Sequence, residues 1–374
     1  MRARDIDLTD RPFVLVWEVT QACDLECKHC RADAQPDRHP GELGTEEGKQ
    51  LLSEAATFGE DQLVVLSGGD PLIRDDLPEL VEYGTREGLS MTLTPSGTES
   101  LTPDVLDELA DAGLRRLALS IDGATAAAHD EFRGEPGSFE GTVSIARYAS
   151  QQGIPLQINT TVSRETLGEL PALAALVEEL GAVLWSVFFL VPIGRGRVLE
   201  PIEPERSDRV MEWLLEQSQE RSFGVKTTEA PHYRRVALQR QAGDAVEPAD
   251  ADTIGRRTGI RAGNGFAFVS HRGEVYPSGF LPEAAGSVRN RSIVDIYRNG
   301  ELFTDLRDVD SLEGKCGECE FRQVCGGSRS RAHAYTGDPL ESDPLCPYVP
   351  AGYDGPLPEH SIEDTRSRPT PSQR

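Results

Sequence analysis

The sequence has few lysines and little positive charge of any kind. Lysine occurs at only four of the 374 positions, namely 28, 49, 226 and 315, so arginine supplies most of the positive charge. Aspartate and glutamate total 63 against 38 lysines and arginines, and the formal net charge is −25. Because like charges repel, this balance excludes nucleic acid as an expected partner.

Long apolar runs are also missing. No stretch approaches the ~18 apolar residues of a membrane-spanning helix, and no apolar region follows Arg2 and Arg4 as in a signal peptide. We therefore expect a cytoplasmic protein with no membrane partner. The acidic, lysine-poor composition favours a halophilic protein that stays soluble in concentrated salt. An ordinary acidic surface encoded by a GC-rich genome is the alternative.

Cysteine is present at seven positions, in the two groups 23/27/30 and 316/319/325/346. Without an export signal, clustered cysteines indicate metal binding or redox chemistry rather than disulfides. The first group places three thiols within eight residues, on a loop after an apolar segment. Three thiolates can bind an iron-containing centre or a zinc ion, and the fourth ligand must come from elsewhere.

Residues 12–223 alternate between short apolar segments and helical segments. The apolar segments are rich in Val, Leu and Ile, as strands buried on both faces require, so the pattern predicts six βα units with a parallel sheet. Right-handed crossovers give either an open sheet or a barrel. The predicted strands are 14–18, 62–66, 90–94, 116–121, 156–162 and 183–191, and the predicted helices are 45–58, 77–87, 103–112, 139–152, 167–180 and 206–219.

The pattern changes after the last of these helices. Residues 265–270 and 274–276 flank a His-Arg-Gly turn and are predicted to form a β-hairpin. Residues 292–298 are predicted to form a short helix. The second cysteine group lies in a stretch with little regular pattern, and a metal site can order such a stretch.

The C-x3-C-x2-C motif of Cys23, Cys27 and Cys30, on a loop after the first strand, resembles the cysteine motif of the radical SAM superfamily. In that family three thiolates hold three irons of a 4Fe-4S cluster, and S-adenosylmethionine binds the fourth iron. The resemblance implies the same cofactors here, and a partial (β/α)6 barrel over about residues 12–223. A zinc site completed by His29 or a distant residue is the alternative.

Gly68-Gly69-Asp70-Pro71, at the end of the second predicted strand, resembles the GGE motif of the family with Asp in place of Glu. Adjacent glycines let backbone carbonyls approach a ligand amine closely, and the acid adds negative charge beside it. The alternative for this motif is an ordinary turn.

Further residues at strand ends would belong to the S-adenosylmethionine site by the same resemblance. Ser120 and Arg133 would contact the carboxylate and ribose region, since arginine is a natural partner for a carboxylate, and Val191 would pack on adenine. An ordinary cap or a satisfied core residue is the alternative for each position. The predicted set is Ser96, Ser120, Asp122, Arg133, Asn159 and Val191, and no residue is assigned a catalytic role.

The second cysteine group resembles the SPASM extension, which carries auxiliary 4Fe-4S clusters. Ser278, Arg329 and Gly263 stand at or near positions where that extension usually has further cysteines. The resemblance therefore implies one auxiliary cluster instead of two. A structural zinc ion held by the same thiolates is the alternative. The predicted ligands are Cys316, Cys319, Cys325 and Cys346.

These resemblances imply an oxidoreductase or lyase that cleaves S-adenosylmethionine reductively to a 5′-deoxyadenosyl radical, which abstracts hydrogen from the substrate. The segments 17–20, 265–270 and 279–282 are most similar to the haem-biosynthesis branch, which implies a porphyrin substrate. Arg195 and Arg197 are candidate partners for its propionates. Maturation of a ribosomally made peptide is the alternative activity, and a non-catalytic metal-binding barrel is the alternative of another class.

The expected electron donor is a ferredoxin or flavodoxin. The expected divisions of the chain are an N-terminal arm (1–11), the partial barrel (12–223), a linker (224–262), a SPASM-like domain with the auxiliary cluster (263–350) and a disordered tail (351–374).

Overall fold

The computed structural model describes residues 6–242 and 259–359. Its strands are β1 (Val14–Thr20), β2 (Leu63–Gly68), β3 (Ser90–Leu93), β4 (Arg116–Ser120), β5 (Leu156–Val162), β6 (Leu184–Phe189), β7 (Gly224–Thr228), β8 (Phe266–Val269), β9 (Glu274–Tyr276) and β10 (Gly286–Ser287). Its α-helices are α1 (Thr45–Ala56), α2 (Leu77–Arg86), α3 (Pro103–Asp111), α4 (Ala126–Arg133), α5 (Ser138–Gln151), α6 (Leu170–Glu179), α7 (Pro204–Glu220), α8 (Tyr233–Ala242), α9 (Ile293–Asn299), α10 (Glu301–Arg307), α11 (Gly314–Gly317) and α12 (Arg329–Thr336).

The strands form one ten-stranded sheet with the order β10-β9-β8-β1-β2-β3-β4-β5-β6-β7. Strand β8 and strands β1 to β7 all run parallel to one another. Strand β9 pairs antiparallel with β8, and β10 pairs antiparallel with β9. Because β7 and β10 remain edge strands, the sheet is curved but not closed. The predicted partial barrel is therefore confirmed, and all six predicted strands are present within a few residues of their expected bounds.

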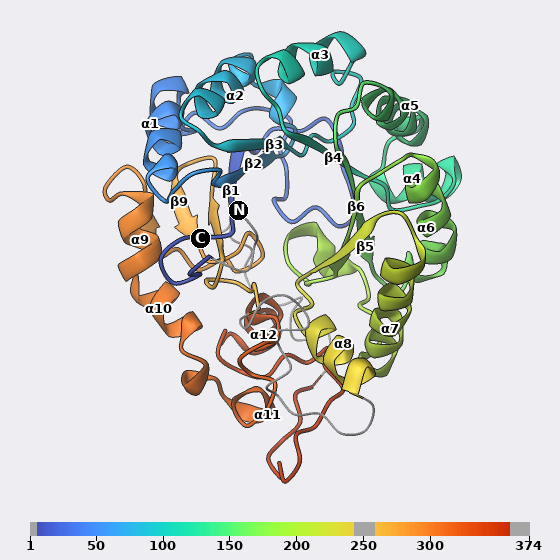
Figure 1. Cartoon of the computed structure of the whole chain (residues 1–374), viewed down its shortest axis with the longest axis vertical. Helices are drawn as coiled ribbons and strands as arrows, with labels where there is room; N and C mark the ends of the chain where they lie inside the picture. The colour runs from blue at the N-terminus through green and yellow to red at the C-terminus, as the bar shows by residue number, and fades with distance from the viewer. Residues whose placement is uncertain (1–5, 243–258, 360–374) are drawn as a thin grey trace.

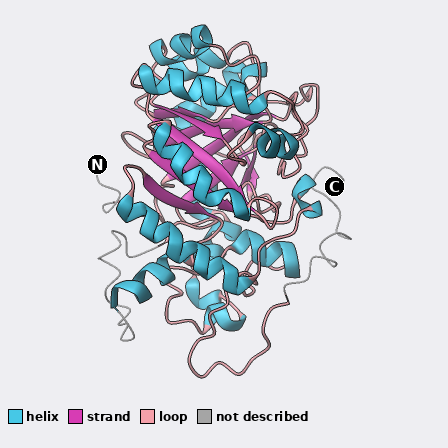
Figure 2. Cartoon of the chain, turned by 90° about the vertical axis from the view of Figure 1, so that its right-hand side faces the viewer, coloured by secondary structure: helices cyan, strands magenta, loops and turns pink. Residues whose placement is uncertain are grey.

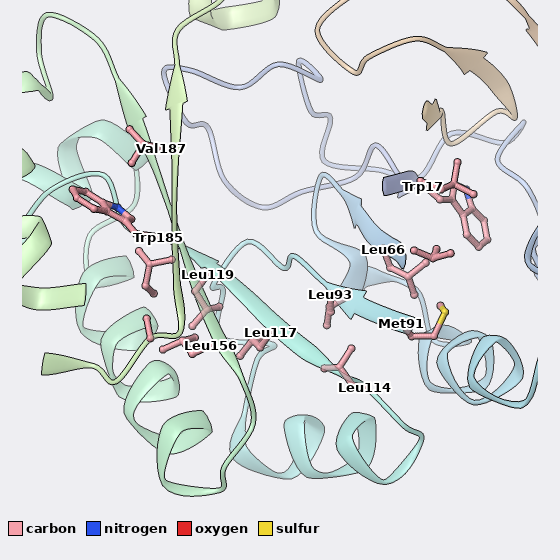
Figure 3. Close-up of a cluster of buried hydrophobic side chains, with 14 of the residues drawn as sticks. Trp17, Leu66, Met91, Leu93, Leu114, Leu117, Leu119, Leu156, Trp185 and Val187 are labelled. Atoms are coloured by element: carbon pink, nitrogen blue, oxygen red, sulfur yellow. The ribbon is translucent and has the colours of Figure 1, made fainter. Parts of the chain in front are cut away.

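Helices α1 to α7 form an arc outside the strands (Figure 1), and Figure 2 shows the strands enclosed by helices. Every second side chain of a strand points outward and is buried beneath these helices. Trp17, Met91, Leu119 and Trp185 are examples, each with 0 % exposure, and Figure 3 shows them along the same apolar layer. This layer is the main hydrophobic core.

The inward face of the strands has a different character. Many of the residues that alternate with the core positions are only half-buried, and several of these are polar, which contradicts the prediction of strands that are apolar and covered on both faces. Because successive side chains of a strand point to opposite faces, the apolar core and the half-buried interior lie on opposite sides of the sheet. The half-buried inward positions include Val16, Val65, Ser67, Arg116, Ser120, Gln157, Thr161, Phe188, Lys226, Phe266 and Tyr276.

The prediction of a linker from residue 224 onwards is wrong for its first part. Strand β7 pairs in parallel with β6, from Leu184 opposite Gly224 to Phe188 opposite Thr228, and α8 then packs beside α7. Strand β7 has the sequence Gly-Val-Lys-Thr-Thr, which lacks an apolar run because its inward positions face the polar barrel interior. Residues 243–258 of the predicted linker lie outside the described residues.

The C-terminal region is joined to the barrel by pairing of β8 with β1. The predicted hairpin is confirmed as β8 and β9, and the predicted short helix is α9, whose Ser292 accepts a hydrogen bond from the Asp295 N–H. The arm preceding β1 packs on α9, where Tyr297 donates a hydrogen bond to the Leu8 carbonyl. Residues 360–374 of the predicted tail lie outside the described residues. In the described part of the chain, no helix has the length and apolar character needed to span a membrane.

The close packing of α1 on the sheet generates a test. A Cβ added at Gly48 in α1 would lie 2.5 Å from the Trp17 ring, whereas one added at Gly141 in α5 meets nothing within 4 Å. We expect G48A to lower the free energy of unfolding by about 1–3 kcal/mol through overpacking. G141A should instead raise it by about 0.5–1 kcal/mol, because alanine favours the helix. Anaerobic denaturant titrations followed by circular dichroism measure both, and a G48A protein as stable as G141A would contradict the packing described here.

Candidate active site

The first three cysteines lie on the loop that leaves the carboxyl end of β1. Cys23 and Cys27 are buried, and Cys30 packs against the same small cluster. The loop is held from outside by the turn Gly194–Val198. There the Arg195 N–H donates to the Cys30 carbonyl at 3.0 Å and the Arg195 side chain donates to the Leu25 carbonyl at 3.3 Å. Arg195 therefore supports the cysteine loop.

The end of β2 approaches the start of this loop very closely. A Cβ on Gly69 would lie 2.1 Å from the Ala22 carbonyl oxygen, so only glycine fits there. The Gly69 carbonyl accepts a hydrogen bond from Ser96 Oγ at 2.6 Å, and Ser96 Oγ is also 3.4 Å from Cys23 Sγ. The structure thus brings the Gly-Gly segment, Ser96 and the first cysteine together, as the resemblance to the radical SAM superfamily implies.

Asp70 occupies a closed environment. Its carboxylate accepts hydrogen bonds from Thr98 Oγ1 at 2.7 Å and from the Leu72 N–H at 3.2 Å, and its side chain is fully buried. Burial raises the pKa of this carboxyl group, although the hydrogen bonds oppose the shift. In this arrangement Asp70 ties the end of β2 to the loop after β3, and its predicted role beside the cofactor stays a prediction.

Asp122 and Arg133 form a buried ion pair beside the cysteines. Arg133 Nη2 lies 3.0 Å from Asp122 Oδ2, and Arg133 Nη1 lies 3.7 Å from Cys27 Sγ. Burial is the largest single influence and would raise the pKa of Asp122, but the charges of Arg133 and of two histidines and the hydrogen bond from the Thr161 N–H together lower this pKa. The Arg133 Nε and Nη2 atoms have no hydrogen-bond partner that satisfies normal geometry. The guanidinium can therefore serve both Asp122 and an anionic group at the cysteine loop.

His29 lies between two of the cysteines in sequence and stacks on Phe132 with ring centroids 4.7 Å apart. Its Nε2 is 3.9 Å from Asp122 Oδ2, and its Nδ1 is buried without a hydrogen-bond partner. Burial lowers the pKa of His29 to about 4, so the ring is neutral near pH 7. In this structure His29 is therefore a neutral ring that packs on Phe132 and lies next to the thiols.

A layer of inward-facing residues crosses four neighbouring strands. Ser120 lies opposite Asn159, Asn159 opposite Ser186, and Ser186 opposite Lys226 in the parallel register of β4 to β7. Asn159 Oδ1 accepts a hydrogen bond from Gln157 Nε2 at 2.7 Å. Two predicted residues, Ser120 and Asn159, therefore share one level of the barrel with a lysine that the sequence analysis passed over.

Val191 is 2 % exposed and packs with Ile193 against Ala334 and Tyr335 of α12. The residue predicted to face adenine thus also contacts the C-terminal region. Its predicted role stays a prediction.

The second cysteine group forms a separate site, remote in sequence from the first. Cys325 and Cys316 are buried, and the charges of the four sulfurs affect one another, as expected for neighbours. Burial raises the pKa of Cys319 to about 12 and that of Cys346 to about 11, with smaller contributions from other cysteines. Such thiols lose their protons when a metal ion binds to the sulfur in place of the proton. Backbone N–H groups of Asp343 and Gly327 already point at Cys316 Sγ and Cys325 Sγ, each at 3.4 Å.

Buried thiols with N–H donors on sulfur fit an iron–sulfur or zinc centre at both sites. Within residues 6–242 and 259–359, no set of three or more Cys, His, Asp or Glu side chains is arranged around one point as ligands of a single metal ion. The fit of these sites to a metal centre therefore rests on the thiol groups, on their burial and on the N–H groups that point at the sulfurs.

Ser278 and Arg329, two of the three positions that depart from the SPASM pattern, have hydrogen-bonded side chains. Glu229, after β7, accepts hydrogen bonds from Ser278 at 2.8 Å, Ser328 at 2.5 Å and Ser330 at 3.0 Å. Nearby, Arg331 donates to the Glu229 carbonyl at 2.7 Å and is paired with Asp343. This polar network joins the barrel to α12.

Sequence reasoning also missed a buried charge group on β1. Glu18 pairs with Arg31 Nη2 at 2.7 Å, directly after the cysteine loop, and with His271 Nδ1 at 2.8 Å in the hairpin turn. Arg31 lies over the Phe268 ring at 4.5 Å. The signal available in the sequence was a lone glutamate inside an apolar strand.

A partial parallel barrel, with three cysteines on the loop after its first strand, is the architecture of a radical SAM enzyme. Residues 17–177 match the family model of the Radical SAM superfamily. The chain belongs to this superfamily, whose members use S-adenosylmethionine and a 4Fe-4S cluster, and it is an enzyme.

Among individual proteins, the chain is similar to the AdoMet-dependent heme synthase of Methanosarcina barkeri (strain Fusaro / DSM 804), with 43 % identity over 348 residues. This alignment covers 92 % of this chain and 99 % of that protein. The AdoMet-dependent heme synthase of Nitratidesulfovibrio vulgaris is 40 % identical over 341 residues, covering 90 % of this chain and 92 % of that protein. Among solved structures, Streptococcus suis SuiB shares the fold with a TM-score of 0.71 and 18 % identity, covering 91 % of this chain and 78 % of that chain.

The Asp122–Arg133 pair generates the second test. D122N leaves the Arg133 guanidinium buried without its carboxylate, and we expect a loss of about 3–5 kcal/mol of unfolding free energy. The double variant D122N/R133M should recover part of that loss, because both charges are then absent. Anaerobic thermal and denaturant unfolding measure the effect, with D107N at the exposed surface as the control, expected to change stability by less than about 0.5 kcal/mol. A D122N protein as stable as D107N would contradict a buried pair.

Proposed function

We propose that this enzyme is a radical SAM haem synthase that converts propionate side chains of an iron porphyrin into vinyl groups with release of CO2. The observation that carries the proposal is similarity along nearly the whole length of proteins named AdoMet-dependent heme synthase, at 40–43 % identity. A related protein at 29 % identity is named Fe-coproporphyrin III synthase, which supports iron-coproporphyrin III as the substrate.

We assign the catalytic 4Fe-4S cluster to Cys23, Cys27 and Cys30, and one auxiliary 4Fe-4S cluster to the four cysteines of the second site. When bound, the catalytic cluster and S-adenosylmethionine supply the 5′-deoxyadenosyl radical that removes hydrogen from the substrate. The chain binds and orients these groups. The close contact of Gly69 with the cysteine loop and the Arg133 guanidinium beside Cys27 support this placement.

The remaining predicted contacts of S-adenosylmethionine are assigned to the same carboxyl ends of the strands. Arg133 would hold the cofactor carboxylate while it stays paired with Asp122. The other residues of the assigned site are Gly68, Gly69, Asp70, Ser96, Ser120, Asn159 and Val191.

The half-buried inward face of the barrel supports a substrate that is a porphyrin with carboxylate side chains. Aromatic side chains at Phe188, Phe266 and Tyr276 offer flat apolar surface. Lys226 contributes a cation at the level of Ser120 and Asn159. We assign Lys226 to a substrate propionate.

This assignment gives the third test. We expect K226M to weaken binding of iron-coproporphyrin by about tenfold to a hundredfold, the usual effect of losing one hydrogen bond to a charged group. K226R should retain most of the affinity, and K49M at the surface should match the wild type. Titrations followed by the porphyrin absorbance measure the affinity. Equal weakening by K226M and K49M would remove Lys226 from the binding site.

The proposed function is tested by anaerobic reconstitution with iron and sulfide. Two clusters predict about eight irons per chain. Incubation with dithionite, S-adenosylmethionine and iron-coproporphyrin III should give haem and 5′-deoxyadenosine, and C27A should give neither. Formation of 5′-deoxyadenosine without any change in the porphyrin would reject the substrate. Modification of a small precursor peptide in its place would favour peptide maturation, the activity suggested by relatives named PqqA peptide cyclase and Mycofactocin maturase MftC at 30 % identity.

We also propose a ferredoxin or flavodoxin as electron donor, a cytoplasmic location and adaptation to high salt. The support for these proposals is the radical chemistry of the superfamily and the net charge of −25 with few lysines.

A further inference from the structure

Arg329 is the first residue of α12 and has 0 % exposure. Its Nη1 donates to the carbonyls of Pro339 at 2.9 Å and Glu341 at 2.7 Å, and its Nε donates to Gly327 at 3.3 Å. Its Nη2 points at Cys316 Sγ, 3.5 Å away. These bonds fix the guanidinium in one orientation, with one edge toward a sulfur of the second cysteine site.

No carboxylate among the described residues lies within ion-pair distance of Arg329. Asp343, the acid nearest to Cys316 in the hydrogen-bond network, is bound to Arg331 through Nη1 at 3.2 Å. A buried positive charge is strongly destabilising unless a negative charge is close to it. The Cys316 sulfur is the group placed to carry that charge, and it does so as a metal-bound thiolate.

The first cysteine site provides a contrast within the same chain. Arg133 also points at a sulfur, that of Cys27, but its charge is shared with the carboxylate of Asp122 at 3.0 Å. The second site has an additional buried arginine, Arg261, whose pKa is lowered to about 10 by burial and then by Arg329. The second site is therefore the more positive of the two environments.

We propose that Arg329 raises the reduction potential of the auxiliary cluster by stabilising an added electron at Cys316, so that this cluster is the easier of the two to reduce. The inference rests on the proposed function. Conversion of one propionate to a vinyl group removes one hydrogen atom, one CO2 and one electron from the substrate. With Arg329 in place, the oxidised auxiliary cluster would accept that electron, and a one-electron carrier with a higher potential than this cluster would remove it afterwards. Arg329 is thus a positioning residue that acts through the cluster.

The test is a redox titration of the reconstituted full-length enzyme followed by electron paramagnetic resonance. R329Q keeps a hydrogen-bond donor but removes the charge, and R329K keeps the charge. We expect R329Q to lower the auxiliary potential by about 59 mV or more, which is a tenfold change for a one-electron couple. R329K should lie closer to the wild type. R322Q is the matched control, since Arg322 is in the same region but is half-exposed and paired with Asp310.

Iron content and 5′-deoxyadenosine formation are measured on the same preparations. An unchanged potential in R329Q, with two clusters present, overturns the inference and leaves the proposed function standing. Zinc in place of iron at the second site also overturns the inference. Loss of 5′-deoxyadenosine formation in the wild-type enzyme rejects the proposed function instead.

A measurement on the wild-type chain covers the case in which R329Q does not retain its cluster. The enzyme is labelled with ¹⁵N-arginine and poised where only the cluster of higher potential is reduced. Pulsed resonance spectra should then show coupling between that cluster and guanidinium nitrogen, as the contact between Arg329 and Cys316 requires. Absence of this coupling overturns the inference.

Discussion

The parallel pairing of β1 with neighbours on both sides is the constraint on which the rest of the structure depends. Strand β2 lies on one side and β8, from the far end of the chain, on the other. The loop after β1 carries the first cysteines, so the C-terminal region is fixed against the site by the same strand. Glu18 reinforces this junction through Arg31, which follows the cysteine loop, and through His271, which follows β8. The relative position of the two cysteine sites follows from this pairing.

Buried charge is the second organising feature. Hydrogen bonds and ion pairs in a low-dielectric interior are strong when complete and costly when a partner is absent. Glu18, Asp122, Asp343 and Glu229 are each satisfied by arginine, histidine or serine partners. Arg329 points at a sulfur instead, and none of the ion pairs among the described residues joins it to a carboxylate. The network around Glu229 joins the barrel to α12.

Several elements were predictable because local sequence patterns specify them. Strand β5 was predicted with its observed bounds, and the outward-facing Val, Leu and Ile positions correspond to the core beneath the helices. The resemblance to the radical SAM superfamily implied that Ser96 and Cys23 share one site, and in the structure they are in contact. Strand β7 was missed because its inward positions are polar, and α12 was missed because its side chains are arginine and serine buried by tertiary contacts.

The sequence by itself determined the class of enzyme, the βα alternation and the two cysteine groups, because these depend on residue types at short spacing. Only the tertiary structure decided which partners the buried charges have and which face of each strand lines a half-buried interior. It also placed Lys226 at the same level of the barrel as Ser120 and Asn159, and the Arg329 guanidinium against the Cys316 sulfur. Such contacts join residues from separate strands or segments, and their geometry depends on the packing of the whole chain rather than on local patterns.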